Sequence, residues 1–74
     1  MKAYRYYLLM RPAMPGTIPT RNVVEIHNFD YRQYVSEIDW KAWGYVDYSE
    51  KLSDADIKNY ELEGGFGIDV EGGE

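Results

Sequence analysis

The sequence predicts an α+β fold, in which a small three-stranded, mainly antiparallel sheet carries one C-terminal helix on one face; a short fourth strand from Glu61 is left open. Three observations support this prediction: three segments rich in aromatic and β-branched residues, one helix-capping pattern near residue 53, and connections whose length favours antiparallel neighbours. A chain of 74 residues forms one domain at most. We expect a single domain over residues 1–63 and a flexible, glycine-rich and acidic tail over residues 64–74.

The first predicted strand runs from Lys2 to Met10, because this segment is rich in aromatic and aliphatic residues and lacks helical spacing. Apolar residues fall on both of its faces, which predicts either a central position in the sheet or a contact on its second side. Three prolines in the following loop, residues 11–19, end the strand and impose an ordered, irregular connection. Loops of this kind often carry function.

Two further strands are predicted, Asn22 to Phe29 and Ala42 to Ser49. Within the third strand Gly44 indicates either a bulge or a close approach by another backbone. The stretch 30–39 fits one or two helical turns as well as an irregular excursion, so its structure stays open.

The clearest local pattern is a helix start at Ser53. Its hydroxyl can cap the free amides of the first turn, and Asp54 and Asp56 complement the positive end of the helix dipole. A short helix from about Asp54 to Tyr60 follows, with Ile57 and Tyr60 facing the sheet.

The composition excludes most catalytic chemistries. With no cysteine there is no disulfide, thiol nucleophile or thiolate metal site, and a single histidine cannot form a histidine cluster. Asp54 and Asp56 lack the spacing of a calcium loop, and the glycines after residue 63 lack a phosphate-binding motif. We therefore expect no enzyme activity, metal or cofactor.

Charge is unevenly distributed along the chain. Residues 1–46 hold six basic and four acidic groups, whereas residues 47–74 hold two basic and nine acidic ones, within a net charge of -5. The acidic part is either a solvated face or a surface that imitates nucleic-acid phosphates and docks on a basic partner. The net charge argues against direct nucleic-acid binding. The candidate acidic residues are Asp47, Glu50, Asp54, Asp56, Glu61 and Glu63.

The sequence also predicts a cytoplasmic location without membrane contact. The first five residues contain no apolar core of signal-peptide length, and the longest apolar run, Tyr6 to Met10, is far shorter than a membrane span.

Eight tyrosines and two tryptophans are more than one small core needs. Either large rings compensate for a small core, or some of them are anchors for a partner. Trp40 is the best candidate for an exposed anchor, because it precedes the strand that holds Trp43 and Tyr45. The residues expected to contact a partner protein are Arg11, Met14, Ile18, Trp40 and Tyr45.

The order of several motifs resembles the large polyvalent protein associated domains of phage and conjugative elements in Firmicutes. The matching segments, within residues 4–62, are Tyr4-Arg5-Tyr6-Tyr7, Arg11-Pro12, Gly16-Thr17, Pro19, Val24-Glu25-Ile26, Asn28-Phe29, Ala42-Trp43-Gly44-Tyr45, Leu52-Ser53 and Tyr60-Glu61-Leu62. This resemblance implies an accessory of a mobile element with no assigned activity, and it transfers no catalytic residue.

Two functions from different classes follow. The first is a non-enzymatic accessory or adaptor of a mobile element, which binds a protein through its exposed sheet face and its proline-rich loop. The second is an acidic inhibitor of a host nucleic-acid enzyme, of the anti-restriction or anti-CRISPR type, which acts by nucleic-acid mimicry. A homodimer that buries the second face of the first strand is a further hypothesis.

Overall fold

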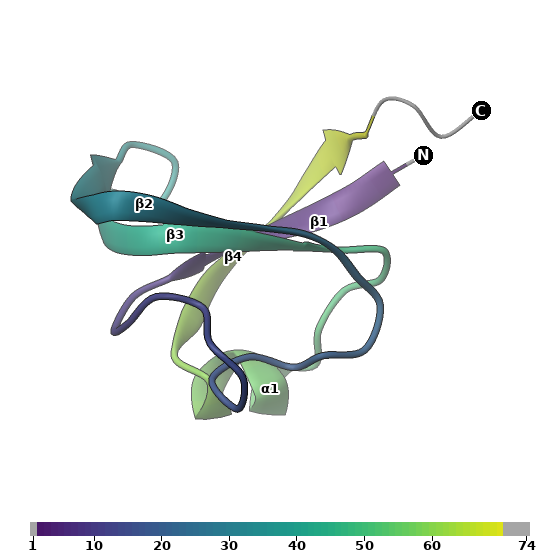
Figure 1. The fold of residues 1–74 in the computed structure, drawn as a ribbon. Helices are drawn as coiled ribbons and strands as arrows, with labels where there is room; N and C mark the ends of the chain where they lie inside the picture. The colour runs from purple at the N-terminus through teal and green to yellow at the C-terminus, as the bar shows by residue number, and fades with distance from the viewer. Residues whose placement is uncertain (1, 71–74) are drawn as a thin grey trace.

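The computed structural model describes residues 2–70, in which four strands form a single sheet (Figure 1). The strands are β1 (Lys2–Leu8), β2 (Val23–Val35), β3 (Trp40–Tyr48) and β4 (Leu62–Asp69), and α1 (Asp54–Asn59) precedes β4. The order across the sheet is β2-β3-β1-β4, and neighbouring strands pair antiparallel. The predicted central position of β1 and the antiparallel pairing are therefore confirmed.

The prediction of a three-stranded sheet is wrong, because β4 makes the sheet four-stranded; it begins at Leu62, where the sequence had left only a short fourth strand open. Residues 64–69, expected to be tail, pair with β1, and Phe66 lies opposite Arg5. A strand can form from glycine-rich sequence because its pairing uses only backbone hydrogen bonds. At Gly64 any larger residue would clash with β1, since a Cβ there would lie 2.6 Å from the Arg5 carbonyl oxygen. Residues 71–74 of the predicted tail lie outside the described residues.

The stretch that the sequence left open completes a β-hairpin. β2 continues to Val35, a turn follows, and β3 begins at Trp40. Gly44 lies where the two strands come closest, since a Cβ there would lie 2.2 Å from the His27 carbonyl oxygen. Of the two alternatives predicted at Gly44, a bulge or a close approach, the close approach is confirmed, and the register of the two strands also shifts directly after its partner Asn28.

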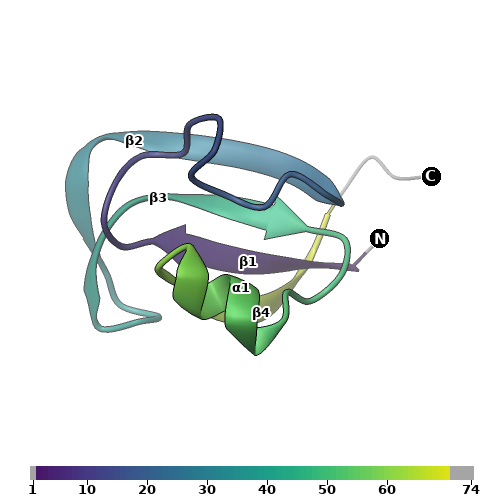
Figure 2. The ribbon, with the colours of Figure 1, turned by 90° about the horizontal axis from the view of Figure 1, so that it is seen from below.

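The sheet has two faces of different character. On the first, which we call the helix face, α1 and the loop between β1 and β2 lie against the sheet (Figures 1 and 2). On the second, the open face, the far end of the β2–β3 hairpin rises above the sheet at one end (Figure 1). The helix-face core consists of Tyr6, Leu8, Ile18, Val46, Tyr48 and Leu62, and the smaller open-face core of Tyr7, Val35, Ile38 and Ala42.

The predicted helix cap is present. The Ser53 hydroxyl accepts a hydrogen bond from the Asp56 amide at 3.1 Å, and Ile57 and Tyr60 pack against the helix-face core. The segment before the cap is held as well, because the Leu52 amide donates to the Tyr6 hydroxyl at 3.0 Å. These contacts fix a helix that is too short to be stable alone.

Candidate protein-binding surfaces

The proline-rich loop is fastened to the edge strand β2 by one side chain. The Asn28 side-chain oxygen accepts from the Ala13 amide at 2.8 Å, and the Asn28 side-chain amide donates to the Ala13 carbonyl at 3.2 Å. This pair of bonds occupies both backbone groups of Ala13, as a neighbouring strand would. The loop is thereby held alongside β2 without being part of the sheet.

A second set of hydrogen bonds shapes the tip of this loop. The Thr17 amide and the Thr17 hydroxyl both donate to the Met14 carbonyl, at 3.0 and 2.8 Å. Gly16 lies within this turn with φ of 88°, in the region that favours glycine. The tip is therefore ordered, although Met14 is 54% exposed.

An apolar hollow of about 260 Å³, which we call the loop cleft, lies between this loop and β2. Buried Ile18 belongs to its lining, and the exposed side chains of Met14 and Ile26 are part of it. The lining contains no ionisable side chain. The residues of the loop cleft are Ala13, Met14, Pro15, Ile18, Thr20 and Ile26.

The centre of the open face is built around Arg5. Its Nε and Nη2 donate to the two carboxylate oxygens of Asp47 at 2.8 and 3.0 Å, and its guanidinium lies 3.7 Å from the centre of the Tyr45 ring. The hydrogen bond to Asp47 raises the pKa of Arg5 further above its ordinary value, so Arg5 stays charged. Asp47 itself is 2% exposed.

Aromatic rings extend from Tyr45 in both directions across the open face. On one side His27 stacks on Tyr45 with ring centres 5.2 Å apart, and Phe29 meets both rings edge to face. On the other side Tyr7 makes edge contacts with Tyr45 and Phe66. Rings cover part of this face in place of a second layer.

Tyr7 lies under the end of the hairpin, where only 6% of it is exposed. Burial raises the pKa of the Tyr7 hydroxyl, and the nearby Glu37 carboxylate raises that pKa further. Glu37 directly precedes Ile38, which packs with Tyr7 in the open-face core.

The five predicted contact residues do not form one surface. Met14 and Trp40 are exposed, Arg11 is exposed and paired with Glu61 at 3.0 Å, and Tyr45 is half-buried among the open-face rings. Ile18 is only 5% exposed and belongs to the helix-face core, and it also lines the loop cleft, so its predicted contact with a partner stays a prediction. The loop folds inward at this residue.

Trp40 lies apart from Met14, at the end of the hairpin. It lines a hollow of about 550 Å³ together with Tyr34, whose hydroxyl donates to Asp39 at 2.6 Å. That hydrogen bond raises the pKa of Tyr34. Arg32 and Lys41 complete the lining, so this hollow mixes rings with both signs of charge.

The predicted acidic surface is also divided. Asp47 is not part of any acidic surface, because it is buried against Arg5 on the open face. Glu61 is paired with Arg11, whereas Asp54 and Asp56 lie in the first turn of α1 on the helix face. Glu63 points to the open face, since it is opposite Tyr7.

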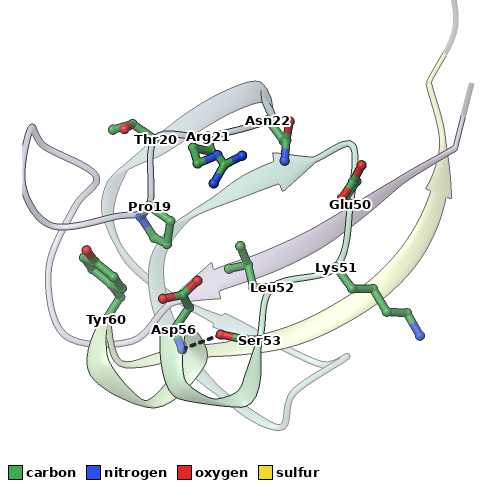
Figure 3. Close-up of a pocket in the computed structure, with 10 residues that line it drawn as sticks. All are labelled: Pro19, Thr20, Arg21, Asn22, Glu50, Lys51, Leu52, Ser53, Asp56 and Tyr60. Carbon is green, nitrogen blue, oxygen red and sulfur yellow. Dashed lines mark hydrogen bonds between the residues drawn. The ribbon is translucent and has the colours of Figure 1, made fainter.

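A hollow of about 440 Å³ beside the start of α1 shows how basic side chains offset these acids (Figure 3). Glu50 and Asp56 line it together with Arg21 and Lys51. Pro19, which also lines the hollow, is held by Tyr48, whose hydroxyl donates to the Pro19 carbonyl at 2.6 Å. Two acidic and two basic groups make this hollow electrically balanced.

Within residues 2–70 there is no group of three or more histidine, cysteine, aspartate or glutamate side chains arranged to hold a metal ion. In the same part of the chain no helix is long and apolar enough to cross a membrane.

Two residues of this region were not predicted from the sequence. Ile26 lines the loop cleft on the side of β2, and Asn28 holds the loop to β2 through its hydrogen bonds to Ala13. The alternation of β2 places both on the side of the proline-rich loop, but an asparagine in a strand gives no indication of a partner 15 positions away. The ion pair between Arg5 and Asp47 could not be predicted either, because the two residues are 42 positions apart in the sequence. Both depend on strand order, which the sequence did not define.

These features define a small, β-rich domain with one apolar cleft and one aromatic sheet face. Residues 1–64 match the family described as defence against restriction A, C-terminal, and the chain belongs to this phage-associated anti-restriction family. The match supports the mobile-element character inferred from the motifs, whereas the resemblance to the polyvalent-protein domains stays a prediction. No curated protein and no solved structure matches the chain.

Proposed function

We propose that this chain is a non-catalytic domain that contributes to defence against restriction by binding a protein through the loop cleft. The observation that carries the proposal is the combination of order and exposure: Met14 and Ile26 are exposed, yet the loop beside them is fixed by Asn28 and Thr17. An apolar surface that is already ordered loses little conformational entropy on binding.

The size and chemistry of the loop cleft favour a protein as the ligand. At about 260 Å³ it is smaller than the sites that typically enclose a small molecule, and it suits one or two apolar side chains. The absence of ionisable groups from its lining offers nothing for acid–base or nucleophilic chemistry.

The test is a protection assay in cells that carry a restriction endonuclease and are challenged with unmodified DNA. We expect the double variant Met14→Ala/Ile26→Ala to lose at least about tenfold of the protection, the loss typical of removing contacts at the centre of an interface. Met10→Ala is the matched control, because Met10 is as exposed as Met14 and does not line the cleft. Full protection by the double variant would contradict the proposal.

The second candidate is an acidic inhibitor that occupies the nucleic-acid site of a host enzyme. The family's link to restriction favours it, and Glu50 and Asp54 are exposed near the start of α1. In this case Glu50→Lys/Asp54→Lys would abolish inhibition of DNA cleavage by a purified restriction endonuclease. The balanced charges beside Asp56 make this candidate weaker than the first.

A further inference from the structure

The open face provides a second surface, on the opposite side of the sheet from the loop cleft. Ile26 faces the cleft, whereas its neighbour His27 stacks on Tyr45. His27 is exposed, Phe66 is 38% exposed, and Phe29 and Tyr45 are half-buried. Side chains from β1, β2, β3 and β4 thus form one connected group of rings without a covering helix.

Acidic side chains surround these rings. Glu25 lies opposite Asp47 in the register, Glu63 lies opposite Tyr7, and Glu37 directly precedes Ile38, which packs with Tyr7 in the open-face core. Glu25, Glu37 and Glu63 are all exposed.

The main positive charge among these residues is already neutralised. Arg5 is held by both oxygens of Asp47, so this ion pair adds no net charge to the face. The three surrounding carboxylates therefore leave the open face with a negative potential.

We propose that the open face docks a segment of a partner protein that carries arginine or lysine side chains. Ring faces attract guanidinium and ammonium groups and cover their alkyl stems, while the surrounding carboxylates pair with the charge. This inference goes beyond the loop cleft and does not depend on it.

Two other occupants fit the charge less well. A nucleic acid would stack on the rings but would bring phosphates against Glu25, Glu37 and Glu63. A second copy of the chain would bring together two molecules with a net charge of -5 each.

The experiment measures binding of hexa-arginine to the full chain by NMR titration, with hexa-glutamate and a single-stranded oligothymidylate as comparison probes. We expect hexa-arginine to shift the signals of His27, Tyr45 and Phe66, with an affinity that falls as salt is raised. Shifts confined to α1, or shifts at the rings with the oligothymidylate and not with hexa-arginine, would overturn the proposal.

Two double variants separate a specific site from general attraction to an acidic protein. Glu25→Gln/Glu63→Gln should weaken hexa-arginine binding about fivefold, whereas Glu50→Gln/Asp54→Asn, which removes the same charge on the helix face, should change it less than about twofold. Equal losses in both would refute a site on the open face. Met14→Ala/Ile26→Ala should leave peptide binding unchanged, so failure here and failure of the loop cleft are distinguishable.

Discussion

The two faces of the sheet are stabilised in different ways. On the helix face, Tyr6, Val46 and Tyr48 are at most 1% exposed, and α1 and the proline-rich loop exclude water from them. On the open face, rings pack against one another around the pair of Arg5 and Asp47. The helix face is stabilised mainly by burial of apolar surface. The open face is stabilised by contacts between rings and by one ion pair, and it leaves side chains accessible to a partner.

The largest expected effect tests the open face. Asp47→Ala removes the carboxylate that holds Arg5 and leaves a guanidinium beside the sheet without its partner. Breaking a buried ion pair from one side typically lowers the free energy of unfolding by about 3–5 kcal/mol, and the 27% exposure of the Arg5 side chain places this case at the lower end. Urea unfolding monitored by tryptophan fluorescence measures the loss.

The double variant Arg5→Met/Asp47→Leu is the matched control for this pair. It removes both charges and keeps apolar volume, so it should recover most of the lost stability. A loss below about 1 kcal/mol for Asp47→Ala, the size expected of a surface pair, would show that the ion pair does not hold the open face together.

An intermediate effect is expected on the helix face. Tyr48→Phe leaves the Pro19 carbonyl without its donor, which should lower the free energy of unfolding by about 2 kcal/mol at neutral pH. Tyr7→Phe, the corresponding change on the open face, should lower the free energy of unfolding by less. The hydrogen bond of 2.6 Å to the Pro19 carbonyl is made by Tyr48, so Tyr7→Phe leaves it intact.

The same tyrosine predicts a pH dependence. Burial raises the pKa of Tyr48 above its ordinary value of 10.0, so the folded state holds this proton more tightly than the unfolded state does. The resulting stability is fully present below pH 10.0 and is lost as the pH rises above it. Urea unfolding at increasing alkaline pH should show a shallower decline for Tyr48→Phe than for the natural chain, and parallel declines would contradict this assignment.

Local patterns predicted the elements whose cause is local. The cap at Ser53 and the start of α1 follow from side chains within one helical turn, and the first strand was recognised from its apolar residues on both faces. The close approach at Gly44 was also readable, because a glycine inside a strand pattern usually has a steric reason.

The missed features depend on contacts between distant segments. Most of β4, residues 64–69, was predicted to be tail because its glycines lack strand propensity, yet the small size of glycine is what allows this strand to approach β1 at Gly64. The inward direction of Ile18 was not predicted either, because the composition of a loop does not define where a single side chain points. The hydrogen-bond partners of Asn28 and Arg5 could not be predicted without the strand order, because those partners lie far away in the sequence.

The smallest expected effect concerns the helix that covers one face. Ser53→Ala removes the acceptor for the Asp56 amide and should lower the free energy of unfolding by about 1 kcal/mol. Hydrogen exchange can locate the change: amides of α1 should exchange faster, whereas those of the β2–β3 hairpin should keep their protection. Ser36→Ala in the hairpin turn is the matched control, because Ser36 is exposed and does not cap α1. If Ser53→Ala accelerated exchange equally over both faces, the helix would be part of one cooperative unit with the open face, and the separation of the two faces would not extend to their stability.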